Sequence, residues 1–551
     1  MANIKFDRKK FERDFGKVND SLIHKIEMFG TPFEGIDDNE IEIEVAPNRP
    51  DLLSYQGFRR SFSAFLDKRR GVKTYKVNKP LKNYEVSVDK SVEDVRPWTS
   101  CAVVKNLKLD DQRVKEIVDM QEKLHATLGR NRKRVAIGIY PLEKIKLPIK
   151  YKALEPDKIN FKPLESKREM SGLEILQKHS TGKEYAHLLS GKTKFPVFTD
   201  AEGKFLSMPP IINSHEIGKV ETSTTDVFIE CSGSDEKIAD QCLNIVVSNL
   251  AEMDGEIYSM KLKGPKKTTP LFEKENMNVS IENAKRILGL DLDEKGMKNY
   301  LERMGHDYSK GKVEIAPWRV DVLSESDLIE DVAIGYGYDK IVPEDLEVYG
   351  IGQEDPRQVV KRKISEILSG LEMLEISNYH LTNNKEQFTN MGVSEKQAKA
   401  SSSNAVNLKV SKTEHNIMRK DLSHFALKIM AENIDAEYPQ KIYETGKVFS
   451  EDSSGISEQE NLSAAISPGD FTEIKQILEY LFGMLGIEVK VEEPKENPSH
   501  LIAGRVADIK IDDKKIGQIG EVHPKILKNW KIKNPVSLFE ISLEEVYGVL
   551  G

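Results

Sequence analysis

Cysteine is scarce in this chain, and the scarcity excludes several classes of protein. Three cysteines occur among 551 residues, and no two of them form a CxxC pair. Three thiols cannot build a disulfide framework, and without paired spacing they do not indicate a cysteine-ligated zinc site. We therefore expect a protein of a reducing compartment, the cytoplasm.

Long hydrophobic runs are missing as well. No stretch approaches the roughly 18 apolar residues that a membrane-spanning helix needs. The N-terminal MANIKFDRKKFERDF also lacks the apolar core of a secretory signal. The sequence therefore predicts no membrane association and no export.

An excess of charge of one sign is also absent, because 82 Lys and Arg residues oppose 90 Asp and Glu residues. The net charge of −8 gives no global indication of nucleic-acid binding, so any RNA contact must come from a local cluster. The richest cluster is Arg130, Arg132, Lys133 and Arg134. It is compatible with phosphate contacts and equally with an ordinary solvated surface.

The length and composition of the chain indicate a folded protein of several domains. Hydrophobic residues make up 38% and charged residues 31%, which is typical of globular proteins, and 551 residues exceed what one core supports. Two lysine-rich segments, 71–95 and 261–267, are predicted to be connectors. The predicted domains are an α/β domain at 1–75, an α+β domain of short strands at 96–262, a small α/β domain at 268–343, and a last domain at 355–551.

Hydrophobic periodicity and turn residues predict several elements within these domains. The first domain should hold a strand at 41–45 and a helix from Leu52 to about Leu66, capped by Asp51 or Ser54. Further helices are expected at 111–128, 235–252, 281–288, 293–304 and 325–334.

Nine sequence blocks, in order along nearly the whole chain, carry a resemblance to a known family. They are APNRPDLLSYQGFRR (46–60), QEKLHATLGRNRKRVAIGIY (121–140), YAHLL (185–189), FLSMPPIINSHEIGK (205–219), DVFIECSGSD (226–235), APWRVDVLSESDLIEDVAIGYGYDKI (316–341), PQKIYETGKVF (439–449), GRVADI (504–509) and IGEVHP (519–524). One short block would carry little weight, whereas nine in one order indicate a relationship. The chain resembles the β subunit of phenylalanyl-tRNA synthetases of the archaeal and eukaryotic-cytosolic type.

The resemblance implies a function and an assembly. The chain would support ATP-dependent attachment of phenylalanine to tRNA(Phe) by an α subunit, in an (αβ)₂ heterotetramer, and would hydrolyse mischarged tyrosyl-tRNA(Phe). Two other hypotheses remain open: a free-standing RNA-binding trans-editing hydrolase, and an assembly scaffold whose cleft is inactive. Co-purification with an equimolar second chain distinguishes the first hypothesis from the other two.

The resemblance also implies an α+β multidomain fold. Its parts would be an α+β editing domain, a small winged or helical magnesium-site domain, and an antiparallel-sheet domain like that of class II synthetases without active-site residues. The chain ends at Gly551 directly after the last of these, and no OB-fold insertion fits near 40–95; both features resemble the archaeal and eukaryotic form. Tyr55, Gln56 and Pro141 depart from the family pattern.

A proofreading site for tyrosine needs a polar group that recognises the extra hydroxyl. Alternation along the strand 227–232 places Glu230 on one face with Phe228 and Ser232, opposite Val227, Ile229 and Cys231. The resemblance implies that Glu230 accepts the tyrosyl hydroxyl proton. It further implies that Asn213, Ser214 and His215 orient the ester and the attacking water, and that the pocket is formed by Leu206, Pro209, Ile212 and Gly233.

Less specific interpretations of these residues stay open. Glu230 could be a solvated charge on an edge strand, and a lone loop histidine such as His215 is often a surface residue. Pro209 and Pro210 cannot both lie inside a central strand, so the chain should turn there.

Four carboxylates, Asp321, Asp327, Glu330 and Asp331, form a candidate magnesium site. Ser324 can cap a helix with Asp327 at its third position, which places three of the acids on one helix face, and Asp321 can reach the same end. Carboxylate oxygens suit Mg²⁺, and the resemblance implies a site shared with the α subunit. The alternative is an ordinary solvated face, since acids are favoured in a first helical turn without any metal.

The last domain lacks residues that an adenylating enzyme of this class needs. Such an enzyme uses one arginine for the α-phosphate of ATP and a second, after a Gly-rich strand, for the γ-phosphate. Arg419 is a candidate relic of the first, but the Gly-rich stretch 517–521 is followed by Val522, His523 and Pro524, with no arginine. We therefore expect a non-catalytic domain that pairs with the α subunit.

Overall fold

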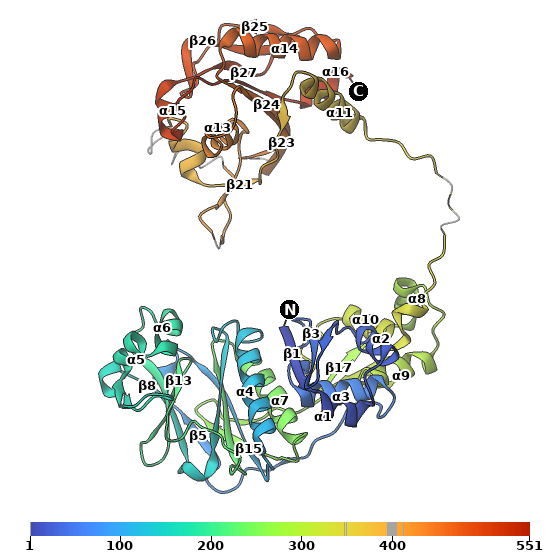
Figure 1. Cartoon of the computed structure of the whole chain (residues 1–551), viewed down its shortest axis with the longest axis vertical. Coiled ribbons are helices and arrows are strands. Elements are labelled where there is room, and N and C mark those ends of the chain that lie inside the picture. Colours follow the sequence, from blue (N-terminus) through green and yellow to red (C-terminus); the bar gives the residue numbers. More distant parts are fainter. Residues whose placement is uncertain are drawn as a thin grey trace. The chain divides into compact units, whose positions relative to one another are not determined.

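The computed structural model describes residues 2–345, 348, 350–393, 405–411, 413–453 and 455–550. The chain divides into two compact units, Met1–Asp345 and Leu346–Gly551 (Figure 1). No helix in the described part of the chain is long and apolar enough to cross a membrane.

The first unit begins with a three-stranded antiparallel sheet and three helices. The strand order is β1-β3-β2. Ser54 caps the third helix by accepting a hydrogen bond from the Gly57 N–H, so the second of the two expected caps is the correct one. The elements are β1 (Ala2–Asp7), α1 (Arg8–Phe15), α2 (Asp20–Met28), β2 (Phe33–Ile36), β3 (Glu40–Val45), η1 (Pro50–Leu52) and α3 (Tyr55–Phe65).

The centre of the first unit is a mixed sheet of eleven strands. Its main path runs β13-β12-β11-β8-β5-β15-β6-β14-β7. The strands on this path are β5 (Glu85–Val88), β6 (Trp98–Lys105), β7 (Val135–Pro141), β8 (Ile149–Leu154), β11 (Phe195–Thr199), β12 (Phe205–Met208), β13 (Ile212–Asn213), β14 (Val227–Gly233) and β15 (Glu256–Lys263), with β4 (Val77–Asn78) and β16 (Lys267–Thr269) beside β15. Helices α4 (Asp111–Ala126) and α7 (Glu236–Ala251) confirm the two helices expected here, and short helices α5 (Gly172–Lys178) and α6 (Ser180–Tyr185) precede β11.

Both expected connectors prove to be parts of this sheet. Strand β5, within 71–95, pairs with β8 and β15, and the segment 261–267 holds the end of β15, the turn after it and the first residue of β16. In β15, Lys261 and Lys263 concealed the strand because they alternate with the buried Met260 and Leu262, and β5 is a strand of only four residues within a lysine-rich segment.

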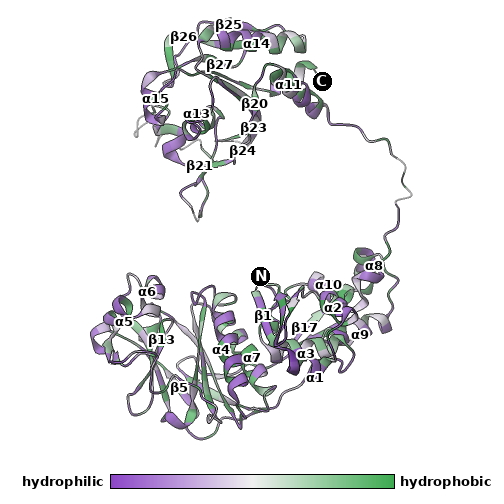
Figure 2. Ribbon diagram, in the orientation of Figure 1, coloured by the Kyte–Doolittle hydropathy of each residue, from purple (hydrophilic) through white to green (hydrophobic). Residues whose placement is uncertain are grey.

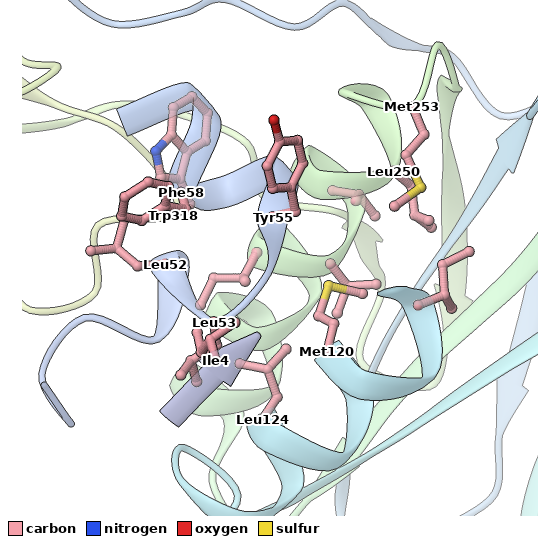
Figure 3. Close-up of a cluster of buried hydrophobic side chains, with 14 of the residues drawn as sticks. Ile4, Leu52, Leu53, Tyr55, Phe58, Met120, Leu124, Leu250, Met253 and Trp318 are labelled. Atoms are coloured by element: carbon pink, nitrogen blue, oxygen red, sulfur yellow. The ribbon is translucent and has the colours of Figure 1, made fainter. Parts of the chain in front are cut away.

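One hydrophobic cluster joins the first sheet to the helices of the large sheet. It contains Ile4 of β1, Met120 of α4, Leu250 of α7 and Trp318, which lies beyond the large sheet in sequence. Figure 3 shows these side chains gathered between the two helices and α3. Figure 2 shows α4 with green and purple residues interleaved, as expected for a helix with one face on this cluster.

The last part of the first unit is a small sheet with three helices. The sheet order is β17-β19-β18, and the helices agree closely with the three expected in this stretch. The elements are β17 (Glu275–Asn278), α8 (Ile281–Leu288), α9 (Glu294–Arg303), β18 (Asp307–Ser309), β19 (Lys312–Ile315) and α10 (Glu325–Tyr336).

The second unit is built on a seven-stranded sheet of order β20-β23-β24-β28-β27-β26-β25. All its pairings are antiparallel except that of β20 with β23. Helices α11 and α14 pack their apolar residues against the sheet in one core cluster. The main elements are α11 (Pro356–Gly370), β20 (Leu374–Glu375), α13 (Ser423–Glu432), β23 (Gln440–Asp452), β24 (Gly455–Ser467), α14 (Phe471–Leu485), β25 (Lys490–Glu492), β26 (Leu501–Ile511), β27 (Lys514–Val522), α15 (Pro524–Trp530), β28 (Ser537–Ser542) and α16 (Glu544–Leu550).

Candidate editing cleft

A cavity of about 570 Å³ lies where the two ends of the large sheet meet. Its lining comes from α4, from β7 at one end of the strand order, and from the turn before β13 at the other end. Two side chains bridge these ends. Arg132 donates to the Ile211 carbonyl oxygen at 2.9 Å, and the Tyr140 hydroxyl lies 3.3 Å from the Asn213 amide oxygen.

Glu230 lines this cavity from the middle of β14. The strand pairs with β6 on one side and β7 on the other, so Glu230 is 2% exposed and is not a solvated edge charge. The expected alternation is confirmed: Ile229 packs in the cluster under α4 and α7, whereas Phe228 packs in a different one.

The Glu230 carboxylate is only half satisfied. Its Oε1 lies 3.2 Å from the Tyr140 hydroxyl, and its Oε2 has no hydrogen-bond partner. Burial raises the pKa of Glu230 to about 7, against the opposing charge of Arg96. A buried carboxyl with a free oxygen at a cavity is equipped to bind a hydroxyl donor, and shifted carboxyls of this kind concentrate at functional sites.

Arg132 closes another side of the cleft. Its guanidinium pairs with Glu122 of α4 at 3.1 Å and lies 4.4 Å from the centroid of the Tyr185 ring. Of the basic cluster, Arg132 and Arg134 are thus engaged internally, Arg134 with Asp235, while Arg130 and Lys133 are exposed.

His125 joins α4 to β7 within the cavity lining. Its Nε2 accepts the Ile137 N–H at 2.8 Å, which requires an unprotonated nitrogen, and burial lowers the pKa of the ring. Sequence reasoning missed His125 and Arg132 as cleft residues and Tyr140 as a contact of Glu230. All three lie in one of the blocks that carry the family resemblance, which was the available signal.

The structure brings together only part of the expected site. Pro209 and Ile212 line the cavity with Asn213 and Glu230, and the two prolines do form a turn, between β12 and β13. The remaining expected residues are not in the cavity lining: Leu206 is wholly buried in the core, Gly233 lies against the Arg134 carbonyl, Ser214 is buried with its N–H bonded to the Leu206 carbonyl, and His215 is exposed.

The four carboxylates do not converge as expected. Asp321 and Asp331 are both bound to Arg319 at 2.7 Å, and Asp331 also lies 2.7 Å from His306. Burial works to raise the pKa of Asp331, but the charge of Arg319 holds it well below its usual range. Within the described residues, no three acid, histidine or cysteine side chains are placed to hold a metal ion. Arg319 thus neutralises two of the four expected carboxylates, and the magnesium site shared with an α subunit stays a prediction.

The other two acids lie on helix α10 and remain available in part. Asp327 uses its Oδ2 to accept the N–H groups of Leu323 and Ser324, in the expected capping arrangement. Its Oδ1 and the exposed Glu330 carboxylate have no hydrogen-bond or ion-pair partner among the described residues.

A second cavity, of about 500 Å³, lies on the sheet of the second unit, and its lining includes acidic side chains together with Lys420 and Lys515. Asp421 and Glu540 line it, and Glu540 is held by the N–H groups of Leu422 and Ser423. Arg419 is not in its lining; the side chain is 2% exposed and pairs with Glu444 at 2.6 Å.

Two family models match the chain. Residues 346–543 match the phenylalanyl tRNA synthetase beta chain CLM domain, and residues 277–338 match the tRNA synthetase B5 domain.

Curated relatives extend the similarity over nearly the whole chain. The "Phenylalanine--tRNA ligase beta subunit" of Thermococcus sibiricus is 36% identical over 91% of this chain and 90% of its own length. That of Archaeoglobus fulgidus is 34% identical over 98% of this chain and 97% of its own length. Among solved structures, an N-terminal fragment of the phenylalanyl-tRNA synthetase beta subunit from Pyrococcus horikoshii matches with 33% identity and a TM-score of 0.58, covering 61% of this chain and 99% of the fragment.

Proposed function

The chain belongs to the family of phenylalanine–tRNA ligase β subunits, and we propose that its cleft around Glu230 hydrolyses tyrosyl-tRNA(Phe), the mischarged product of that ligase. As a member of this family the chain is a subunit of an aminoacyl-tRNA synthetase, which serves protein biosynthesis. Tyrosine differs from phenylalanine by one added hydroxyl, and a hydrophobic synthetic pocket rejects such an isostere only about 100-fold. A second, hydrolytic site that requires the hydroxyl raises the overall selectivity for phenylalanine over tyrosine.

The free oxygen of Glu230 is the observation that carries this proposal. A tyrosyl ester in the cavity gives Oε2 the hydrogen-bond donor that it lacks. A phenylalanyl ester leaves the same buried oxygen unsatisfied, which costs about 1–3 kcal/mol. The cleft thus favours the wrong ester, as a proofreading site must.

Asn213 is the second residue of the proposed site. It lines the cavity and contacts the Tyr140 hydroxyl, so its amide is placed to orient the ester or the attacking water beside Glu230. Ser214 and His215 have no part in the proposal, because the first is buried outside the cavity lining and the second is exposed. The exposed Arg130 and Lys133 are the cations that we assign to tRNA(Phe) phosphates.

The proposal extends to the assembly. The chain works with a phenylalanyl-tRNA synthetase α subunit, as an (αβ)₂ heterotetramer in the cytoplasm, and the α subunit forms the adenylate from ATP. The state of Arg419 supports this division, because the side chain is buried in an ion pair with Glu444 and is not available to a triphosphate. Asp327 and Glu330 are the two residues that would contribute to a magnesium ion shared with the α subunit.

Glu230→Ala in the complex with the α subunit tests the proofreading function. Losing a charge-assisted hydrogen bond should slow deacylation of tyrosyl-tRNA(Phe) by roughly 10- to 150-fold while phenylalanine charging stays nearly intact. The measurement is deacylation of pre-formed tyrosyl-tRNA(Phe), with thermal stability followed in parallel.

Glu184→Ala supplies the matched control. Glu184 is a glutamate in the same cavity lining, but it is exposed, so its removal should leave the deacylation rate unchanged. Equal deacylation by wild type and Glu230→Ala at equal stability would refute the role of Glu230.

A further inference from the structure

Strand β7, which pairs with β14, has a gap beside Glu230 where a side chain is missing, and we call this gap the Gly138 notch. Gly138 of β7 is directly paired with Glu230 of β14, and Tyr140 follows two residues later on the same face. A Cβ atom at Gly138 would overlap the hydroxyl and the ring of Tyr140. The missing side chain therefore provides the space into which the Tyr140 ring folds back toward Glu230.

The ring is fixed from its other side as well. Tyr140 is wholly buried. Its ring stacks on the ring of Phe228, which lies two residues before Glu230 on β14, and the ring centroids are 5.9 Å apart. The Tyr140 hydroxyl lies 3.2 Å from the Glu230 Oε1 and 3.3 Å from the Asn213 amide oxygen, and the Ser207 hydroxyl is a further neighbour. One hydroxyl proton cannot serve both acceptors at once.

This geometry decides which Glu230 oxygen a ligand can reach. With Oε1 occupied by Tyr140, the carboxyl plane is set and Oε2 is left for the substrate. Without the Tyr140 hydroxyl, Oε1 loses the donor that distinguishes it from Oε2, so the carboxyl can rotate and the free oxygen has no fixed position.

We propose that Tyr140, seated in the Gly138 notch, is a positioning residue that makes the cleft specific for esters with a phenolic hydroxyl. The inference rests on the proposed editing function and deepens it. Tyr140 acts through Glu230 on recognition of the tyrosyl side chain, and through Asn213 it links that recognition to the part of the cavity assigned to the ester.

Tyr140→Phe in the full complex with the α subunit tests the proposal. It should slow deacylation of tyrosyl-tRNA(Phe) about tenfold, the effect of one lost hydrogen bond, and should act through KM rather than kcat. The slow deacylation of phenylalanyl-tRNA(Phe), which uses no phenolic hydroxyl, should not change. Combining Tyr140→Phe with Glu230→Ala should be no worse than Glu230→Ala alone, because the two residues act as one unit.

A pH profile adds a readout that a merely structural role would not move. The Tyr140 hydrogen bond lowers the pKa of Glu230, so its loss should shift the inflection near pH 7 to higher pH. Tyr151→Phe is the matched control. Tyr151 is buried in the same hydrophobic cluster, but its hydroxyl donates to the Arg96 carbonyl oxygen at 2.7 Å, so the profile should stay in place.

Gly138→Ala is a second, independent variant, since it removes the notch and keeps the hydroxyl. It should reproduce the selective loss for tyrosyl-tRNA(Phe). If Glu230→Ala abolishes deacylation while Tyr140→Phe and Gly138→Ala leave rate and pH profile unchanged, the positioning role is overturned and the editing function stands. If Glu230→Ala has no effect either, the editing function itself fails.

Discussion

At the scale of single residues, alternation is the part of the site that sequence can supply. A strand puts every second side chain on one face, so the sequence alone predicts that Phe228 and Ser232 share a face of β14 with Glu230. The burial of Glu230 does not follow, because it depends on β6 and β7 lying on both sides, and those pairings join residues more than 80 positions apart. Likewise, the capture of Asp321 and Asp331 by Arg319 depends on how β19 and α10 are placed.

The buried Glu230 should make folding stability depend on pH. Its pKa is about 7 in the folded chain against an ordinary 4.5, so between these pH values the folded state holds a proton that the unfolded state has lost. Stability should therefore fall as pH rises through this window, by roughly 3 kcal/mol for a shift of this size. Burial causes the rise in pKa, and Arg96, Ser232 and Tyr140, the groups that face Glu230, each act against it.

Denaturant unfolding of the wild type and Glu230→Gln between pH 4 and 8 measures this effect. The side chain of the variant cannot ionise at this position. As the pH rises, the free energy of unfolding of the wild type should therefore fall relative to that of the variant. Parallel profiles for the two proteins would show that Glu230 does not ionise within the fold.

At the scale of elements, helices were predicted well, and the strands within the two expected connectors were not. Helices α4, α7, α8, α9 and α10 carry local signals, which are apolar spacing and a capping side chain at the first turn. Strand β5 has only four residues, and it owes its place to β8 and β15 on either side. Such a strand is specified by its partners rather than by its own composition.

Substitutions in helix α10 test whether its acidic residues take part in the association with the α subunit. Glu330→Gln should weaken the magnesium dependence of association with the α subunit, because the exposed carboxylate is one of two left for a shared ion. Thermal stability should stay unchanged, since Glu330 has no partner within the described residues. The measurement is α–β association across a magnesium titration.

Asp327→Asn is the informative comparison on the same helix. Asp327 caps α10, so this variant should lose about 1 kcal/mol of stability in addition to any effect on association. An unchanged titration with both variants would identify the two acids as ordinary surface carboxylates.

At the scale of the whole molecule, the resemblance of sequence blocks identified the protein family, whereas composition and hydrophobic periodicity did not. Nine short blocks indicated the ligase β-subunit family, which the relatives establish over 91% or more of the chain. Composition alone reached no further than a folded protein of several domains. The reason is that the proposed editing site is a cleft assembled from the two ends of one sheet, and no local signal reports how those ends meet.

The purified chain alone should form no aminoacyl-adenylate. Arg419 is held by Glu444, no arginine opens α15, and the nearby cavity presents Asp421 and Glu540. Neither of the two arginines that adenylation needs is therefore available to a triphosphate. ATP–pyrophosphate exchange with phenylalanine is the measurement, and the complex with the α subunit is the positive control. Exchange by the chain on its own would contradict this division of labour.

The pairing of β6 with β14 has a consequence for how the protein is made. The two strands are separated by about 120 residues, from Lys105 to Val227, and β6 finds its other neighbour, β15, later still. Ribosomes add about 5–20 residues per second, so a nascent chain carries the apolar β6 without either partner for on the order of ten seconds. An unpaired apolar strand is prone to aggregate over such an interval. The geometry that buries Glu230 thus makes biosynthesis of this subunit dependent on protection of its sixth strand, by chaperones or by transient contacts within the growing chain.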